Sequence, residues 1–538
     1  MLTHGVGILY KVATQTGDEM MDRDVQTKEL DDDDKWTQQP SCAQGASGGE
    51  NGASTFVEQE SSSSAILSSA GRDVRRLTEF TKNAGQLILD LLLEENYKPE
   101  LNVSKPSKNV PFSVGQCVFS VGPLVEDNTK IRAVAFSRCQ SALVASALFI
   151  TKSPIASLRE KSLVCCWSMH DVLRPSYALS CVDRVTCCCF GPDRATTVFA
   201  GLDNGSIASW SLVEVPESEC AWIPWRDSDI RLRTPSYQTA LVDANACCSP
   251  VVQVATAPIS AHTSTTDYTL AAVEQNAGSV HLWTVIEHDT KIGASEHNDA
   301  LHDLGLQPGG RLRMVKRSVI SHASVARRQL LHFNAFCAVM RSTDDSHFIG
   351  TDLGRILRLG RATNRTLRQY RNDLDAPADV LSVHLSPFDD SILLSGSTDG
   401  VIRLYRLSRT EPLATFPTAG LNAKHETSQA PAAKRAVTHV RWSAVTPTVF
   451  YSITDSSVFH VWNFAKDRFQ PVSGHKFETP IECFEVTSTG DNELLAFGDL
   501  TGQLTVHLGV ERKKSHSNAN RDKNEHGDSL LVDIFDSL

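Results

Sequence analysis

The chain has 538 residues, 41% of them hydrophobic, and 52 Lys and Arg against 63 Asp and Glu give it a formal net charge of -11. This hydrophobic fraction is typical of a globular protein, and the length admits one large domain or two to three smaller ones. A dedicated nucleic-acid binder would concentrate basic residues on one face. A membrane-spanning helix would need about 20 consecutive apolar residues. We therefore expect neither nucleic-acid binding nor membrane insertion.

Residues 1–70 are rich in Ser, Gly, Asp and Gln and are predicted to be a disordered arm. Two pieces, "VATQTGDE" (12–19) and "RDVQTKEL" (23–30), each hold a Gln-Thr pair in a β-favouring, acid-flanked setting. Such segments can add as an extra strand to a partner's sheet edge, although a plain linker is equally compatible with two dipeptides. The candidate binding residues are Thr14, Gln15, Thr16, Val25, Gln26 and Thr27. The run "DDDDK" (31–35) is interpreted as a solvated charge block.

Residues 71–98 change period, because apolar residues recur there every three to four positions. The pattern predicts an amphipathic helix with a wide apolar face. The helix either packs on the following domain or binds another protein, and a helix outside a closed domain favours a partner. The candidate partner-facing residues are Leu77, Phe80, Leu87, Ile88 and Leu91.

Residues 99–127 are interpreted as a linker, and a repeat follows from 128 to 510. Six-residue segments with a small residue first, an apolar third and usually an aromatic last recur seven times, beginning 43, 73, 76, 46, 57 and 45 positions apart. They are SLVCCW (162–167), GSIASW (205–210), GSVHLW (278–283), GRILRL (354–359), GVIRLY (400–405), SVFHVW (457–462) and GQLTVH (502–507). Three spacings match the blade of a β-propeller, and the other three require insertions.

Each hexamer follows an apolar run that ends in a tight turn, and a third apolar run lies farther upstream. One such unit cannot bury both faces of its sheet, whereas seven units in a ring cover each other. The fold class is therefore all-β, a seven-bladed WD40-type β-propeller. Gly and Asp in these turns supply positive φ or bond their own backbone. The structural turn residues are Gly201, Asp203, Gly205, Gly350, Asp352, Gly354, Gly396, Asp399, Gly400, Gly498, Asp499 and Gly502.

Three insertions map to loops between strands. The stretch 211–250 is interpreted as either a docking loop or an ordered surface loop. The stretches 284–328 and 419–435 are polar connections, and residues 511–538 form a polar tail.

The sequence shows no catalytic constellation. It lacks GxxxxGK[ST], GxGxxG after a strand, GxSxG and HExxH. Most of the 14 cysteines lie in apolar stretches such as "VTCCCF" (185–190), without the spacing that zinc requires, and are predicted to be buried free thiols of a reducing compartment. The N-terminus turns polar too early for a signal peptide. We predict a cytoplasmic protein that is not an enzyme and has no cofactor and no metal.

Two stretches then resemble a known family. "FIGTDLGRILRL" (348–359) and "VLSVHLSPFDDSILLSGSTDGVIRLYRLSRTEPLATF" (380–416) look like the paired blades of dynein intermediate chains. "VQTKELDDDDKWTQQP" (25–40) resembles the segment that precedes the propeller in the dynein-2, intraflagellar-transport type. Four extra acidic residues between Glu29 and Trp36 depart from that pattern.

The resemblance implies a non-catalytic subunit of a motor complex. Its partners would be a dynein heavy chain, dynein light chains, a second intermediate chain and intraflagellar transport particles. Its locations would be the cytoplasm, the cytoskeleton, and the cilium and its base. The alternatives are an axonemal dynein intermediate chain and a WD40 scaffold or adaptor unrelated to dynein.

Overall fold

The computed structural model describes residues 77–88 apart from 79 and 87, and most of 101–509. Within the second range, the segments outside the described residues are 106–109, 126–128, 193–195, 214–220, 227, 240–248, 259–266, 277, 288–311, 321–332, 342, 344, 361–367, 373–377, 419–434 and 491. The chain divides into two units, Met1–Lys98 and Pro99–Leu538, which we describe separately.

The first unit contributes one helical segment over 77–88. Its residues are mostly good or neutral helix formers, and Thr81 Oγ1 bonds back to the Leu77 carbonyl at 2.7 Å. No helix in the described part of the chain is long and apolar enough to cross a bilayer.

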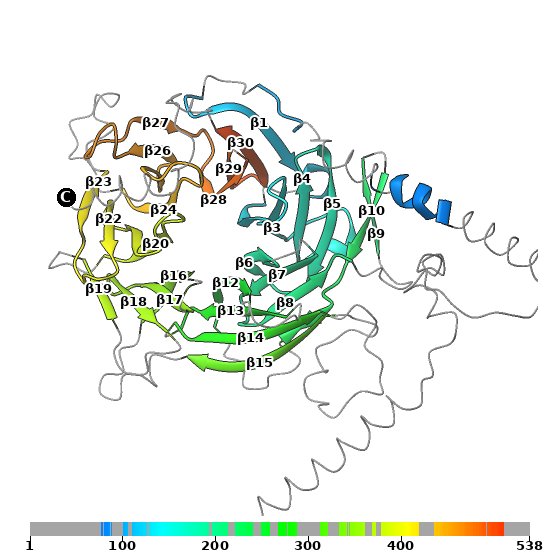
Figure 1. Cartoon of the computed structure of the whole chain (residues 1–538), viewed down its shortest axis with the longest axis horizontal. Helices are drawn as coiled ribbons and strands as arrows, with labels where there is room; N and C mark the ends of the chain where they lie inside the picture. Colours follow the sequence, from blue (N-terminus) through cyan, green and yellow to red (C-terminus); the bar gives the residue numbers. More distant parts are fainter. Residues whose placement is uncertain are drawn as a thin grey trace, which may run out of the picture. The chain divides into compact units, whose positions relative to one another are not determined.

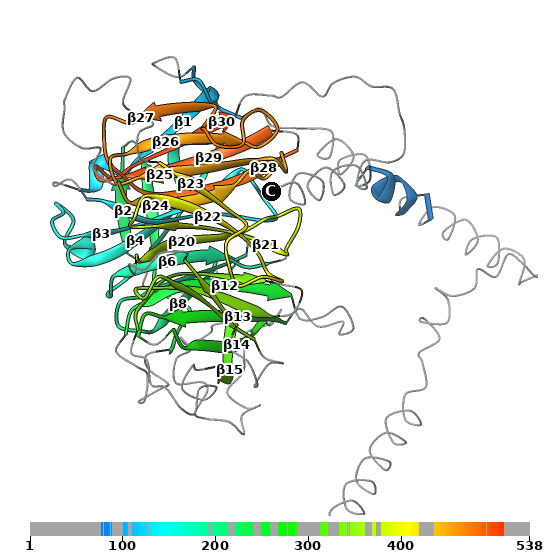
Figure 2. The ribbon, with the colours of Figure 1, turned by 90° about the vertical axis from the view of Figure 1, so that its left-hand side faces the viewer.

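The second unit is a ring of seven antiparallel sheets, or blades, which Figure 1 shows around a central channel and Figure 2 shows from the side. Blade 1 begins with β2 (Ile131–Phe136), β3 (Leu143–Ile150), β4 (Lys161–Ser168) and β5 (Asp171–Cys181). Blade 2 contains β6 (Val185–Phe190), β7 (Thr197–Leu202), β8 (Ile207–Ser211) and β11 (Tyr237–Gln238). Blade 3 contains β12 (Val251–Pro258), β13 (Tyr268–Glu274), β14 (Val280–Glu287) and β15 (Leu312–Ile320).

The remaining blades follow the same order. Blade 4 contains β16 (Ala335–Arg341), β17 (Ser346–Thr351), β18 (Arg355–Leu359) and β19 (Arg368–Arg371). Blade 5 contains β20 (Val380–Leu385), β21 (Ile392–Ser397), β22 (Val401–Arg406) and β23 (Ala414–Pro417). Blade 6 contains β24 (Val437–Trp442), β25 (Val449–Thr454), β26 (Val458–Asn463) and β27 (Ser473–Lys476). Blade 7 contains β28 (Ile481–Thr489), β29 (Asn492–Asp499), β30 (Gln503–Gly509) and β1 (Ser113–Ser120). Two short 3₁₀ turns, η2 (Gly122–Leu124) and η3 (Ala156–Leu158), complete the elements of this unit.

The seven repeated hexamers overlap the third strand of each blade, and the upstream runs fall on the first and second strands. Each first strand contacts the first strand of the next blade, and β28 contacts β2, so the ring is closed. The core lies between blades, where apolar side chains of both sheet faces are buried. The predicted seven-bladed propeller is confirmed.

Ring closure depends on β1, which lies within the stretch 99–127 that the sequence analysis interprets as a linker. That interpretation is wrong for residues 113–120, because β1 pairs antiparallel with β30 as the outer strand of blade 7. The chain therefore closes its own ring with strands from both ends of the domain. This pairing joins residues almost 400 positions apart, which a local pattern cannot reveal.

The insertion 211–250 also contributes strands. β9 (Trp222–Trp225) and β10 (Ser228–Arg233) form a hairpin, and β10 pairs in parallel with β5, so blade 1 has six strands. Trp225 is buried and its Nε1 donates to the Leu173 carbonyl at 3.0 Å. Of the two interpretations of this insertion, the described part fits an ordered surface element.

Candidate functional site

The predicted turn glycines divide into two groups. Gly201, Gly350, Gly396 and Gly498 lie on second strands, where the first strand of the next blade approaches closely. A Cβ added at Gly201 would stand 2.7 Å from Cys187 Sγ and 2.6 Å from a methyl group of Val251. The packing between blades therefore requires glycine at this position.

The second group holds the turn itself. Gly205, Gly354, Gly400 and Gly502 all have positive φ, between 67° and 86°. At Gly400 a Cβ would also meet the Arg435 carbonyl at 2.7 Å. These positions need glycine for backbone conformation and for space at once.

The turn aspartates tie their turns to neighbouring backbone. Asp203 Oδ1 accepts a bond from the Arg184 backbone N–H at 3.3 Å, and Asp499 Oδ1 accepts from the Thr501 and Gln503 N–H groups at 2.9 and 2.8 Å. Asp352 Oδ2 accepts from Asn334 Nδ2 at 3.1 Å. Each carboxylate sits in a different blade and is occupied by local hydrogen bonds. These contacts assign the four aspartates a structural arrangement within turns.

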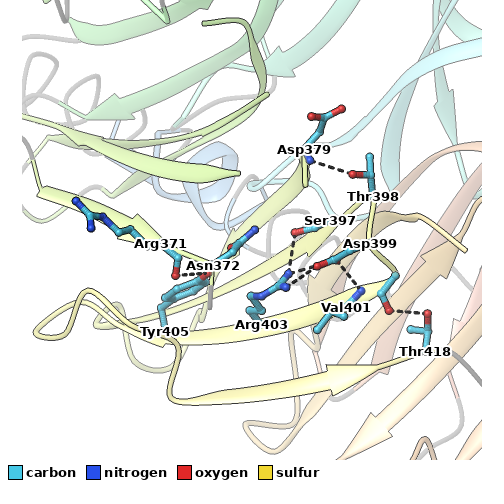
Figure 3. A network of polar contacts seen from close by, with 11 residues as sticks. Arg371, Asn372, Asp379, Ser397, Thr398, Asp399, Val401, Arg403, Tyr405 and Thr418 are labelled. Carbon is cyan, nitrogen blue, oxygen red and sulfur yellow. Dashed lines mark hydrogen bonds and ion pairs between the residues drawn. The ribbon is translucent and has the colours of Figure 1, made fainter. Parts of the chain in front are cut away.

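Asp399 differs because it also pairs with a buried arginine (Figure 3). Arg403 is only 1% exposed, and its guanidinium donates to both Asp399 oxygens and to Ser397 Oγ. Asp399 Oδ1 also accepts from the Val401 backbone N–H at 3.0 Å. The sequence analysis identified the aspartate and missed its partner. The available signal was an arginine in the middle of an otherwise buried strand, "VIRLYR".

Three cysteines connect neighbouring blades in a repeated way. Cys187, Cys337 and Cys483 each lie two residues into a first strand and aim their thiols at the carbonyl of the first residue of the next blade, at 3.4–3.7 Å. Burial raises the pKa of Cys187 to about 11 and that of Cys337 to about 12, so both thiols stay protonated. Protonated buried thiols are poor nucleophiles. All ten cysteines that the structure describes are free.

The central channel contains a cavity of about 660 Å³ lined by the first strands of the blades. Its charged groups are paired, as in Arg441 Nε with Glu485 Oε2 at 3.3 Å. Burial, assisted by the positive charge of Arg441, lowers the pKa of His384 and of His439 to about 3, so both imidazoles are neutral. Within the described residues, no group of three or more His, Cys, Asp or Glu could hold a metal ion.

The helical segment exposes the apolar residues predicted to face a partner. Leu77, Phe80 and Ile88 are 64%, 70% and 56% exposed, and they follow the three-to-four spacing of one helix face. Leu87 and Leu91 lie outside the residues whose side chains are described, as do the predicted segment residues Thr14, Gln15, Thr16, Val25, Gln26 and Thr27. The described part of the helix thus carries an apolar face that is open to solvent.

Comparison with known proteins follows the same direction as the sequence motifs. No family model matches the chain. It is 26% identical over 509 residues to "Cytoplasmic dynein 2 intermediate chain 1" of Homo sapiens, covering 89% of this chain and 45% of that protein. It is 26% identical over 366 residues to "Cytoplasmic dynein 2 intermediate chain 2" of Homo sapiens, covering 64% of this chain and 59% of that protein.

A flagellar protein and a solved structure show weaker similarity. The chain is 23% identical over 385 residues to "Dynein, 78 kDa intermediate chain, flagellar outer arm" of Chlamydomonas reinhardtii, covering 71% of this chain and 49% of that protein. Chaetomium thermophilum Sqt1 bound to the N-terminus of ribosomal protein L10 aligns with a TM-score of 0.44 at 15% identity, covering 72% of this chain and 98% of that one. The chain spans about half the length of the first curated relatives it matches. The resemblance to dynein-2 intermediate chains is confirmed as a similarity.

Proposed function

We propose that this chain is a non-catalytic intermediate chain of a dynein-2 motor complex. The observation that carries the proposal is the similarity to both dynein-2 intermediate chains, which extends over 89% of this chain for the first of them. The closed propeller with structurally occupied turn carboxylates is consistent with a scaffold, because no described group is left to act as a general acid or base.

In this proposal the propeller binds the tail of a dynein heavy chain. A closed ring of seven interlocked blades is a rigid body, and a rigid surface loses little conformational entropy when it binds. The segments around Gln15 and Gln26 bind light chains, and the light chains link this chain to a second intermediate chain. Several tethered contacts raise the effective concentration of each further one. The cellular role is retrograde intraflagellar transport and cilium assembly, at the cytoskeleton and in the cilium.

The helix supplies a separate contact in this scheme. Its exposed Leu77 and Phe80 offer an apolar face of the kind that a partner groove accepts. Lys82 is exposed on the opposite side of the same helix and provides a matched control.

The test is purification of the tagged full chain from ciliated cells, followed by mass spectrometry of the subunits that co-purify. We expect a dynein heavy chain, light chains and a second intermediate chain. Phe80→Asp should remove a subset of these subunits while Lys82→Glu retains all of them. Recovery of neither a heavy chain nor light chains would refute the proposal.

An axonemal dynein intermediate chain is the second candidate, which the similarity to the flagellar outer-arm protein favours. The two functions differ in location. An axonemal subunit stays in detergent-extracted axonemes, whereas a transport subunit is extracted with the membrane and matrix fraction and moves along the cilium when tagged.

A further inference from the structure

The two outer strands of blade 4 carry four arginines and no acidic residue. β18 reads RILRL and β19 reads RQYR. In their register Arg355 lies opposite Arg371, and Arg358 lies opposite Arg368. Directly opposite residues share a face of the sheet, where like charges repel. We refer to these four residues as the arginine strip.

The strip is not neutralised by carboxylates within the described residues. Arg355 Nη1 donates to Gln369 Oε1 at 3.1 Å, and Arg368 Nη1 donates to the Leu407 carbonyl at 2.6 Å. Figure 3 shows the Arg371 side chain pointing away from the network around Asp399. Glu411 is exposed in the β22–β23 connection, next to Thr410, whose carbonyl accepts from the Arg371 backbone N–H.

Arginines elsewhere in the same blades do have acidic partners. Arg341 pairs with Asp390 at 2.8 Å, and Arg403 pairs with Asp399. The net charge of the chain is -11, so acidic residues are abundant. The absence of such partners for Arg355, Arg368 and Arg371 is therefore a local property of this edge of the described propeller.

The strip is also accessible and well supported. Arg368 and Arg371 are exposed, and Arg355 and Arg358 are half-buried. β18 and β19 lie at the outer edge of the ring (Figure 1). The Arg358 guanidinium lies 5.7 Å from the centre of the buried Phe348 ring, which positions it.

We propose that the arginine strip binds an extended acidic segment of another protein, whose carboxylates bridge the opposed arginines. Guanidinium groups bind carboxylates through paired charge-assisted hydrogen bonds. The two pairs are three residues apart along the strands, about 10 Å, which matches carboxylates three residues apart in an extended peptide. This inference does not depend on the assignment to a dynein complex.

Two other anionic partners fit the strip less well. Single-stranded nucleic acids stack their bases on exposed aromatic rings, whereas Phe348 and Tyr370 under the strip are fully buried. A membrane surface is bound with apolar anchors, and none of the exposed large apolar side chains of the described residues lies on β18 or β19.

The experiment uses the full chain and a fluorescein-labelled peptide of alternating Glu and Ser, with binding measured by anisotropy at about 50 mM and about 300 mM salt. We expect binding that weakens several-fold at the higher salt. Arg355→Gln/Arg371→Gln should weaken it about tenfold, since charge-assisted hydrogen bonds are lost. The control is Arg174→Gln, an exposed arginine on β5, which should bind within about twofold of the parent.

A second measurement separates binding from a structural role. Arg371→Gln removes a side chain that makes no hydrogen bond or ion pair to described residues, so its unfolding temperature should equal or exceed that of the parent, because repulsion is relieved. Lower stability together with unchanged peptide binding would overturn the proposal. Equal binding by parent and double variant, or tighter binding to oligouridine of equal charge than to the peptide, would do the same.

Discussion

Asp399→Ala should be among the most damaging single changes in the propeller. It leaves Arg403 charged and buried, with Ser397 Oγ as its remaining hydrogen-bond acceptor, and it deprives the Val401 N–H of its acceptor. Removing one partner of a buried ion pair costs about 3–5 kcal/mol, because the other charge stays desolvated. Most domains are stable by only about 5–15 kcal/mol, so this is a substantial fraction.

The assay is urea denaturation followed by tryptophan fluorescence, with two reference variants. Asp203→Ala changes the same repeat position in blade 2, where the carboxylate accepts a backbone bond and has no arginine partner among the described contacts. It should cost about 1 kcal/mol. Asp399→Ala/Arg403→Leu removes the stranded charge and fills its space, so it should recover about 2 kcal/mol of the loss.

The reasoning fails if Asp399→Ala is no more costly than Asp203→Ala, or if the double variant is as unstable as the single one. Either result would mean that the free energy of unfolding does not depend on compensating the buried Arg403 charge.

Three further changes test the ring. Gly201→Ala should destabilise it by about 1–3 kcal/mol in urea, since a Cβ would overlap Cys187 Sγ, and Cys187→Ala in the same chain should restore part of that; no rescue would contradict the packing argument. Deleting 113–120 should leave β30 as an open edge and produce larger species on gel filtration, whereas an unchanged monomer peak would show that β1 is dispensable. Lowering the pH from about 7.5 to about 5.5 should reduce stability by about 1 kcal/mol for each of His384 and His439, because their pKa is about 3 when folded and about 6.5 when unfolded, so the unfolded chain binds more protons in this window. His384→Gln should flatten that dependence, and a urea midpoint that does not change with pH would refute it.

The repeat could be predicted because each blade repeats the same local requirements. Strand three alternates within a hexamer such as GVIRLY, and the residue before it must adopt positive φ, as Gly400 does. Ser457 takes the corresponding place in blade 6 with φ of 58°, which explains why that copy reads weakly. The exposed apolar face of the helix was equally readable, since spacing alone places Leu77 and Phe80 together.

Other features needed contacts between distant segments. β1 gains its place from β30, and the β9–β10 hairpin gains its place from β5, so neither follows from its own pattern. The opposed arginines of β18 and β19 required the strand register, because spacing in the sequence does not say which residues lie opposite one another.

The sequence by itself determined the number of blades, the turn chemistry and the similarity to dynein-2 intermediate chains, because those depend on residues close together in the chain. Only the tertiary structure decided how the ring closes, which glycines serve packing and which serve φ, and where charge is left uncompensated. The physical reason is that burial, steric contact and electrostatic pairing are set by neighbours in space. In a closed ring the neighbours of Gly201, Arg403 and Arg371 include residues from other strands and other blades.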